Sequence, residues 1–382
     1  MIVGDAAALR HSPPTEPLAY DDALARLRLI RTPSIGPVSF RQLLARFGTA
    51  AAAIEALPTL ARRGGGRVPQ VTDAAVAQRE LEAVAKAGAR YLFLGRDDYP
   101  PLLAELSDAP PVLTIRGDLS LATRDTVAMV GARNASAASC RFARGLAQEV
   151  AHAGAVVVSG LARGIDTAAH EGAGAATIGV IAGGIDVAYP PENARLQDRI
   201  AEEALLVAEM PPGTEPRARH FPHRNRIIAA LSLGTVVIEA APRSGSLITA
   251  RLAGEAGREV MAVPGHPSDP RAQGCNGLIR DGAILVQSAA DVLEQVRPID
   301  LRAANRLNGV RSPNVTWGAP PPEDASEAER RRVVSLLGPV PVGVDELVRQ
   351  AGFAPAVVQM VLLELELGGR LERHAGGRVS LC

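Results

Sequence analysis

Short apolar runs recur through the middle of the chain and alternate with alanine-rich stretches of helical character. The runs occupy residues 127–130, 155–159, 177–182, 205–209, 235–239, 259–263 and 283–286. Their starts are roughly 20 to 30 residues apart, the length of one strand followed by one helix. Strands that are apolar along their whole length are buried on both faces, as in a parallel sheet covered by helices. The pattern predicts an α/β fold over residues 98–297, with an extended Rossmann-like, doubly wound parallel sheet.

Residues 18–88 show the spacing of amphipathic helices instead. Apolar side chains recur at helical intervals in residues 24–30 and 40–47, and Pro33-Ser-Ile-Gly-Pro37 forms a tight turn between them. Two helices joined by a glycine turn predict an all-α helix-hairpin-helix or SAM-like domain, whose turn amides can hold a phosphate. An ordinary pair of antiparallel helices is the alternative.

The last part of the chain begins with a segment that has no periodicity. Residues 298–325 are rich in asparagine, proline and arginine, include three consecutive prolines at 320–322, and are predicted to be a linker. Residues 329–337, 344–351 and 355–367 then show helical patterns, and residues 368–381 resemble a β-hairpin that turns at Gly376-Gly377. Residues 326–382 are therefore predicted to form a winged-helix domain.

The helix of this domain that would enter a DNA groove is unsuited to DNA. Residues 357–367 are apolar apart from Gln359 and two acids, Glu364 and Glu366, and they contain no basic residue. A helix that reads duplex DNA needs basic or polar side chains for phosphates and bases. We expect this helix to contact protein rather than DNA.

Composition limits the class of protein. Aromatic residues make up only 3% of the 382 residues, so the cores must be built from alanine, valine, leucine and isoleucine. The 41 basic and 41 acidic residues balance, which favours one focused basic face over a surface that coats nucleic acid everywhere. Cys140, Cys275 and Cys382 form no pair with metal or disulfide spacing, as expected of free thiols in a reducing compartment.

Targeting signals are also missing from the pattern. The chain has no apolar run of membrane-spanning length, and its first 14 residues do not resemble a signal peptide. We therefore expect a cytoplasmic protein with no membrane partner.

One segment concentrates positive charge. Residues 217–226 contain four arginines, two histidines and one phenylalanine, Phe221, without a single acid. Arginines can hold the phosphates of a nucleic-acid strand while an aromatic ring stacks on a base. The alternative is a solvated loop followed by an arginine-rich helix start.

Glycine and hydroxyl residues follow the predicted strands at their carboxyl ends, where ligands bind in open parallel sheets. Gly131-Ala-Arg-Asn-Ala-Ser136 follows the first strand, Ser159-Gly-Leu-Ala-Arg-Gly-Ile-Asp166 the second, and Gly183-Gly184 the third. Pro242-Arg-Ser-Gly-Ser-Leu-Ile-Thr249 follows the fifth. These loops predict a groove with a glycine floor and arginines around it, which suits a run of adjacent phosphates better than one small molecule.

Catalytic machinery is not evident. The single lysine, Lys86, lies outside the sheet domain, which excludes a P-loop, and neither H-E-x-x-H nor G-x-S-x-G occurs. Glu209 and Glu239 could form a carboxylate pair, but acids at strand ends commonly cap helices. Asp166 occupies an N-cap position and His170 a packing position within an alanine-rich helix. We predict no catalytic residues, no metal and no cofactor.

The combination of loops resembles the DprA/Smf family of DNA-processing proteins. The motifs that carry this resemblance are Val127-Ala-Met-Val-Gly-Ala-Arg133, Ser159-Gly-Leu-Ala-Arg-Gly-Ile-Asp-Thr-Ala-Ala-His170, Phe221-Pro-His-Arg-Asn-Arg-Ile-Ile228, Arg243-Ser-Gly-Ser-Leu-Ile-Thr-Ala250, Tyr99-Pro-Pro-Leu102, Pro264-Gly265 and Gly274-Cys-Asn-Gly-Leu-Ile-Arg-Asp-Gly282. The resemblance extends over about residues 24–296, and the terminal winged helix also fits it. Ala132 departs from the family pattern, where a hydroxyl residue often follows the glycine.

The resemblance implies a non-catalytic protein that binds single-stranded DNA, forms a homodimer through its Rossmann domain, protects incoming DNA and loads RecA recombinase during natural transformation. RecA and single-strand-binding protein are then the implied protein partners. Arg133, Arg163, Arg224 and Arg226 would contact phosphates, and Phe221 would stack on a base. The implied DNA-binding set is Gly131, Arg133, Ser159, Gly160, Arg163, Gly164, Gly183, Phe221, Arg224, Asn225, Arg226, Arg243, Ser244, Gly245 and Ser246.

Two other classes of protein are alternatives to this interpretation. A nucleotide-binding phosphoribohydrolase on a related Rossmann variant would share the glycine loops, but Gly234-Thr-Val-Val-Ile-Glu239 lacks the Pro-Gly-Gly that precedes such a segment in those enzymes. A transcriptional regulator that reads duplex DNA through its winged helix is disfavoured by the acidic helix at residues 355–367.

Overall fold

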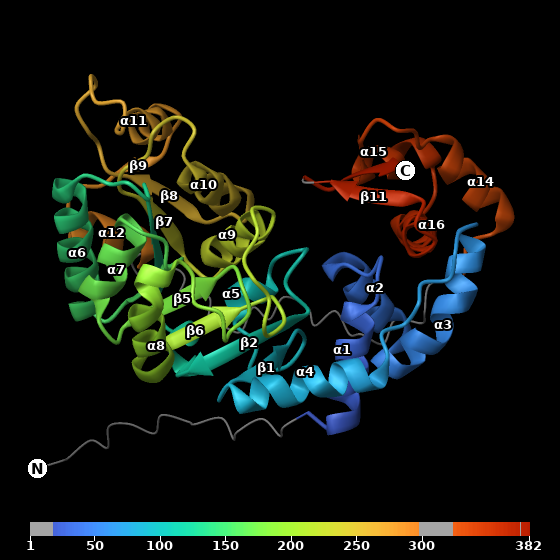
Figure 1. The fold of residues 1–382 in the computed structure, drawn as a ribbon. Helices are drawn as coiled ribbons and strands as arrows, with labels where there is room; N and C mark the ends of the chain where they lie inside the picture. The colour runs from blue at the N-terminus through green and yellow to red at the C-terminus, as the bar shows by residue number, and fades with distance from the viewer. Residues whose placement is uncertain (1–17, 298–323, 375) are drawn as a thin grey trace, which may run out of the picture.

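The computed structural model describes residues 18–297, 324–374 and 376–382, arranged as a helical N-terminal domain, a central sheet domain and a C-terminal winged helix (Figure 1). Most of the predicted linker, residues 298–323, and the first 17 residues lie outside the described residues. The predicted fold class is confirmed, with three differences of detail described below.

The N-terminal domain consists of α1 (Tyr20–Arg31), α2 (Pro37–Phe47), α3 (Ala50–Arg63) and α4 (Ala74–Lys86). The turn before α2 ends at Gly36, whose extended backbone is followed by Pro37 in the first helical turn, where a missing N–H costs nothing. Helices α1 to α3 share a core that includes Leu29, Phe40 and Leu57.

The central sheet has nine strands, in the order β1-β2-β6-β5-β4-β3-β7-β8-β9. The strands are β1 (Arg90–Phe93), β2 (Val112–Gly117), β3 (Thr126–Val130), β4 (Val156–Ser159), β5 (Thr177–Ile181), β6 (Leu205–Ala208), β7 (Gly234–Val237), β8 (Glu259–Ala262) and β9 (Ile284–Leu285). All seven predicted strands are present, and they pair in parallel.

The predicted parallel sheet is extended at one edge by two antiparallel strands. Strand β2 runs antiparallel to β6, and β1 runs antiparallel to β2. These two strands were not predicted from the sequence, and β1 precedes residue 98, where the predicted sheet domain began. The parallel block itself is doubly wound, because the chain crosses from β5 and β6 on one side of β3 to β7 on the other.

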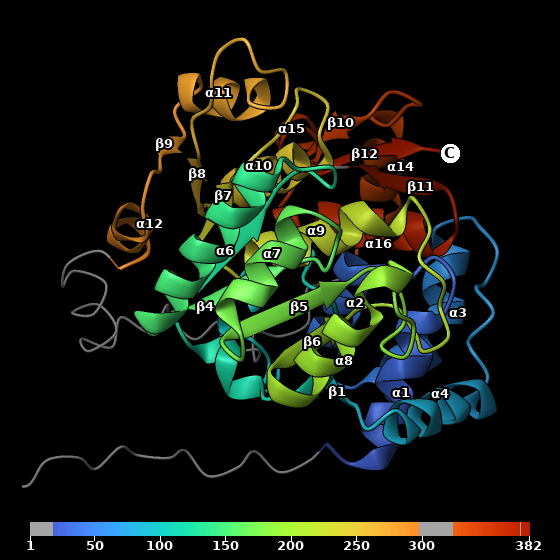
Figure 2. The same ribbon diagram turned by 60° about the vertical axis from the view of Figure 1, so that its left-hand side comes forward.

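Helices cover both faces of the sheet (Figures 1 and 2). Neighbouring residues of a strand point to opposite faces, so Val127 and Met129 pack on one side while Ala128 and Val130 pack on the other. The first side holds α6 (Ala137–His152), α7 (Ile165–Ala173) and α12 (Ala289–Val296). The second side holds α8 (Ala194–Glu203), α9 (His220–Ala230), α10 (Gly245–Glu255) and α11 (Gln273–Arg280).

Three shorter helices lie in connections of the sheet domain. They are α5 (Pro101–Ala104) and the 3-10 helices η1 (Leu119–Thr123) and η2 (Pro191–Asn193).

The C-terminal domain is a winged helix, as predicted. It contains α14 (Glu327–Ser335), α15 (Val344–Ala351) and α16 (Pro355–Leu367), followed by β11 (Leu371–His374) and β12 (Arg378–Leu381). A short third strand, β10 (Val342–Gly343), pairs with β12 and was not predicted, because two residues are too few to show a strand pattern.

The N-terminal domain packs against the antiparallel edge of the sheet. Leu27 of α1 shares a core with Phe93 of β1, and the Tyr91 hydroxyl donates a hydrogen bond to Glu80 at 2.6 Å. Within the described residues no single helix is long and apolar enough to span a membrane, although two sharply bent helix pairs, α2 with α3 and α15 with α16, would be if each were counted as one segment.

Candidate nucleic-acid interface

A small pocket lies where the loops after β3, β4 and β5 meet the start of α9. Its volume is about 40 Å³, far below the roughly 300–1,000 Å³ of sites that enclose a small molecule. The pocket is lined by Arg133, Gly160, Ala162, Arg163, Ala182, Tyr189, Pro190, Phe221 and Arg224. Five members of the predicted site are thus brought together, from segments up to about 90 residues apart.

The half-buried ring of Phe221 is the centre of the pocket's aromatic surface. The guanidinium carbon of Arg133 lies 4.9 Å from the ring centroid, and that of Arg224 lies 5.9 Å away. The ring of Tyr189 is 5.8 Å from Phe221 and tilted by 57°. Two guanidinium groups and a second aromatic ring thus lie within 6 Å of the Phe221 ring. Such a surface can hold both a phosphate and a base.

Arg224 is the buried member of the arginine set, with only 6% of its surface exposed. Its Nη1 atom lies 3.8 Å from Oδ2 of Asp166, and its Nε atom has no hydrogen-bond partner among the described residues. Burial lowers the pKa of Arg224 and raises the pKa of Asp166, while the opposite charge of each partner counteracts the shift. Asp166 therefore holds the Arg224 charge at the floor of the pocket.

Gly160 leaves the space that Arg224 occupies. A Cβ atom on Gly160 would lie 1.2 Å from Nη1 of Arg224, so no other residue type fits there without moving the guanidinium. Glycine is thus needed at position 160 because the Arg224 side chain lies so close to its backbone. The role of Gly160 in the pocket is to make room for this arginine.

Asp166 does not cap α7, contrary to prediction. The N-cap is Gly164, and Asp166 lies inside the first turn, where its carboxylate accepts hydrogen bonds from the amides of Gly160 at 3.2 Å and Ala162 at 3.4 Å. The left-handed backbone of Gly164 (φ 77°) turns the chain so that this carboxylate faces back into the loop. The acid organises the loop that lines the pocket.

His170 is a packing residue, as predicted, and it also fixes the same loop. The Thr177 hydroxyl donates to the Val157 carbonyl, so it accepts from Nδ1–H of His170 at 2.8 Å. Nε2 of His170 is then unprotonated and accepts from the amide of Leu161 at 3.3 Å. Complete burial lowers the pKa of His170 to about 3, so the ring is neutral at physiological pH.

This histidine makes a prediction about acid stability. The pKa of His170 in the folded protein is below its value of about 6.5 in the unfolded chain. The neutral ring therefore contributes fully to the free energy of unfolding above pH 6.5, and this contribution is lost as the pH falls toward 3. Across this window His170→Asn should reduce the pH dependence of the unfolding free energy by up to about 1.4 kcal/mol per pH unit. Denaturant titrations from pH 7 to pH 4 measure it, with His152→Asn at an exposed site as the control. Equal pH dependence in His170→Asn and wild type would contradict the buried neutral ring.

Four predicted site residues shape the loops and do not line the pocket. A Cβ atom on Gly131 would lie 2.5 Å from Ile165, one on Gly164 would lie 2.3 Å from the Ala132 carbonyl, and one on Gly183 would lie 2.8 Å from the Thr214 carbonyl. The hydroxyl of Ser159 is buried and donates to the Met129 carbonyl at 2.6 Å. These residues allow or fix close contacts between neighbouring loops.

The structure does not bring Arg226 to the pocket. The Arg226 side chain is buried, pairs through Nη2 with Glu209, and donates from Nη1 to the Asp108 carbonyl at 2.7 Å. Its role as a phosphate contact is therefore corrected to a structural ion pair. In α9, residues 224 and 226 point to different sides because they are two positions apart in a helix.

The loop at the start of α10 is also outside the pocket. Ser244 is the N-cap of this helix, its hydroxyl lies 2.7 Å from that of Ser246, and Arg243 is exposed. Gly245 is the first helical residue, and Asn225 of α9 is half-buried away from the lining. Their predicted contacts with DNA remain predictions.

Both strand-end acids have structural partners, but only Glu239 caps a helix, as the capping interpretation expected. The carboxylate of Glu239 accepts hydrogen bonds from the hydroxyls of Ser136 and Ser139 at the start of α6, at 2.7 and 2.8 Å. Glu209 pairs with Arg226. Among the residues that the structure describes, no group of three histidine, cysteine or acidic side chains could hold a metal ion.

Four lining residues were missed from the sequence. Ala162 and Ala182 are too common in this chain to stand out, whereas Tyr189 and Pro190 belong to a segment that was noted after the third strand. Tyr189 is 44% exposed and packs beside Phe221. A scarce aromatic at the carboxyl edge of the sheet was the signal that could have identified it.

Family models match all three parts of the chain. The model described as DNA recombination-mediator protein A matches residues 90–297, the DprA-like N-terminal HHH domain matches residues 20–83, and the DprA winged helix domain matches residues 318–377.

Individual relatives agree. The chain is 32% identical to Protein Smf of Synechocystis over 90% of this chain and 95% of that protein. It is 48% identical to DNA processing protein DprA of Streptococcus pneumoniae over 52% of this chain and 71% of that protein.

Two solved structures are also similar. DprA of S. pneumoniae matches with a TM-score of 0.55 and 41% identity over 64% of this chain and 81% of that one. DNA processing protein A of Helicobacter pylori, whose structure is described in terms of its single-stranded DNA binding mode, matches with a TM-score of 0.50 and 30% identity over 55% of this chain and 97% of that one.

Proposed function

The chain belongs to the DprA/Smf family of DNA recombination-mediator proteins, and we propose that it binds single-stranded DNA without sequence specificity in the Phe221 pocket. The observation that carries this proposal is the Phe221 ring with Arg133 and Arg224 beside it. Arginines attract phosphates of any sequence, and every base has a face that can stack on a ring. The relative from H. pylori, described as binding single-stranded DNA, supports it.

The size of the pocket favours a strand over a free nucleotide. The pocket is far smaller than a site that encloses a small molecule, so most of any bound ligand must lie outside it. A single strand can place one unstacked base against Phe221 and continue along the surface, whereas the bases of a duplex are already stacked on each other.

Mutants should distinguish the contribution of charge to DNA affinity from the contribution of base stacking. Arg133→Ala should lower the slope of log affinity against log salt by about 0.7, the value for one lost phosphate contact on a single strand. Phe221→Ala should weaken binding by roughly 1–3 kcal/mol and leave the slope nearly unchanged, because stacking releases no counterions. Fluorescence anisotropy with a labelled oligonucleotide across a salt series measures both quantities.

Arg79→Ala is the control, because Arg79 is an exposed arginine on α4 that lies outside both the pocket and the predicted DNA-binding set. A salt slope in Phe221→Ala as low as that of Arg133→Ala would show that the ring does not act by stacking. Thermal unfolding of Phe221→Ala tests the competing explanation that the half-buried ring only stabilises the fold.

We further propose that the protein acts as a homodimer through the sheet domain. Joining two pockets raises avidity for long strands without new contacts. Leu285 on the edge strand β9 is 45% exposed and Ile248 on α10 is 37% exposed, which suits an interface in the carboxyl half of the sheet. Sedimentation of the full chain as a monomer at micromolar concentration would contradict this proposal.

In this proposal the bound strand is protected and then transferred to RecA recombinase in the cytoplasm during natural transformation. The protein would relieve the inhibition that single-strand-binding protein imposes on RecA. Transfer to RecA and relief of inhibition can be assayed together, as the rate of RecA filament formation on DNA coated with single-strand-binding protein. An unchanged rate in the presence of this protein would contradict both.

We propose no enzymatic turnover. Glu209 and Glu239, the acids that a phosphoribohydrolase-like alternative would use, are engaged with Arg226 and with the hydroxyls of Ser136 and Ser139. Release of ribose from a nucleoside monophosphate, or metal-dependent cleavage of DNA, by the purified protein would overturn this proposal.

A further inference from the structure

Helix α16 is apolar on two sides, and each side belongs to a different core. Val358, Val361, Leu362 and Leu365 pack inside the winged helix. Met360, Leu363 and Leu367 instead join the core of the N-terminal domain, beside Phe40, Leu43 and Leu57. A helix that is hydrophobic all round is buried on all sides, which explains the composition of residues 357–367.

The N-terminal domain is shaped to receive this helix. Gly64 and Gly66 follow α3, and Cβ atoms there would lie 1.9 Å from the Glu364 carbonyl oxygen and 1.8 Å from the Gly368 carbonyl oxygen. Both contacts are with backbone, which cannot rotate away. Neither glycine has a left-handed backbone, so the close approach of α16 is the reason that these positions tolerate no side chain.

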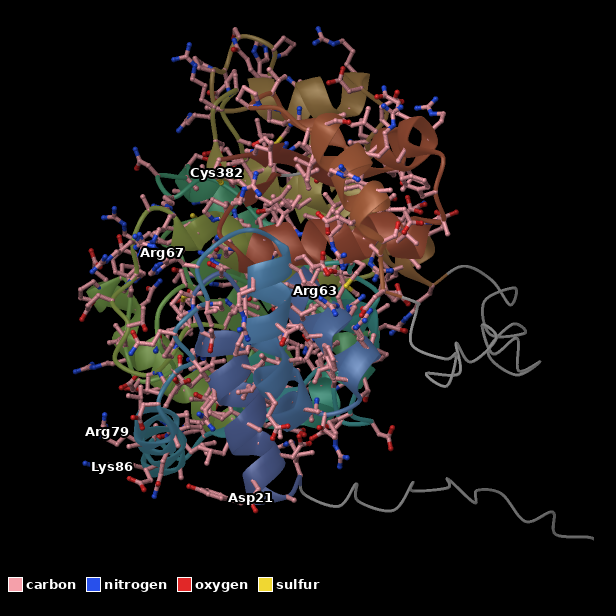
Figure 3. The ribbon with its side chains drawn as sticks, turned by 90° about the vertical axis from the view of Figure 1, so that its right-hand side faces the viewer. Asp21, Arg63, Arg67, Arg79, Lys86 and Cys382 are labelled. Carbon is pink, nitrogen blue, oxygen red and sulfur yellow. The ribbon has the colours of Figure 1, made fainter. Side chains whose placement is uncertain are left out.

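Polar contacts surround the apolar contact. Asp324 accepts hydrogen bonds from Arg46 and Arg63, Gln42 donates to Gln359 at 2.7 Å, and Arg370 donates to the Gly64 carbonyl at 3.2 Å. Figure 3 shows the winged helix resting on the N-terminal helices on this side of the molecule, with Arg63 labelled at the junction. The two terminal domains are thus joined by an apolar centre and a polar rim, the arrangement of a specific interface.

We propose that α16 is the docking helix of this interface, and that it holds the winged helix on the N-terminal domain as one structural unit in solution. A winged helix that reads duplex DNA inserts this helix in the major groove, which requires one face to be free. Here both faces are covered, and Glu364 is held by Arg330 at 2.7 Å. The domain therefore does not read duplex DNA through α16 while it is docked.

The test uses the full chain with a protease recognition sequence inserted between residues 298 and 323. After cleavage of the folded protein, the fragment that contains the winged helix should co-elute with the remainder in gel filtration at about micromolar concentration, as expected for a dissociation constant below that value. Gly64→Ala/Gly66→Ala should separate the two fragments, because both new methyl groups collide with the α16 backbone.

Gly36→Ala is the matched control in the N-terminal domain, because a Cβ there meets nothing within 4 Å. Met360→Glu is a second, independent variant, since Met360 packs on the N-terminal core and not on the core of the winged helix. Circular dichroism checks that both fragments remain folded. Separation of the wild-type fragments after cleavage, or co-elution in both Gly64→Ala/Gly66→Ala and Met360→Glu, would overturn the proposal.

Discussion

Replacing Gly160 with alanine is expected to weaken binding of single-stranded DNA at least about tenfold, or about 1.4 kcal/mol. The new methyl group would lie 1.2 Å from Nη1 of Arg224, so the guanidinium must move from its position at the floor of the pocket. A charged hydrogen bond to a phosphate contributes about 1.5–3 kcal/mol, and its loss should also lower the salt slope by about 0.7.

Gly145→Ala is the control for this variant. Gly145 lies within α6, and a Cβ atom there meets nothing within 4 Å, so alanine should leave DNA binding unchanged. Anisotropy titrations of both variants with one oligonucleotide give the comparison. Wild-type affinity in Gly160→Ala would mean that the position of Arg224 does not matter for the ligand.

Arg226→Ala is expected to act on stability instead. Removal of the guanidinium leaves Glu209 largely buried without its charged partner, which costs about 3–5 kcal/mol in comparable pairs. The folded variant should retain the salt slope of the wild type, because Arg226 does not line the pocket. Denaturant unfolding and a DNA titration below the unfolding temperature measure the two effects separately.

A double-mutant cycle identifies the cause. If the unpaired acid is responsible, Arg226→Ala/Glu209→Ala should be more stable than Arg226→Ala alone. A lower salt slope in Arg226→Ala would restore this arginine to the set of phosphate contacts.

The parallel strands could be predicted because burial on both faces leaves them apolar throughout. Strands β1 and β2 escaped prediction because their patterns are not apolar throughout: β1 begins with an arginine, and a threonine and an arginine interrupt the apolar residues of β2. Their antiparallel pairing depends on contacts with α1 and α4, which a local pattern does not contain.

The two arginines of α9 show what local reasoning can and cannot give. Phe221 and Arg224 are three residues apart, so they share a side of the helix, whereas Arg226 is two residues from Arg224 and points elsewhere. Helical spacing could have separated them once the start of α9 at His220 was known. The identity of their partners, Asp166 and Glu209, could not have been predicted, because other elements supply them: Asp166 lies in α7 and Glu209 follows β6.

The apolar character of α16 predicted contact with a protein partner, and in the structure this helix packs on a protein surface. Its partner is the N-terminal domain of the same chain, and Gln42 and Gln359 in this contact are 317 residues apart in sequence. Nothing in a local pattern connects them. The need for glycine at positions 64 and 66 is evident only once α16 is seen packed against them.

The affinity of the full chain for one oligonucleotide, single-stranded and annealed to its complement, tests the central claim most directly. Measured across a salt series, the single strand should bind at least about tenfold more tightly at moderate salt, because only unstacked bases can reach Phe221. Equal affinity for the two forms would mean that charge alone drives binding and would contradict the pocket as the site of recognition.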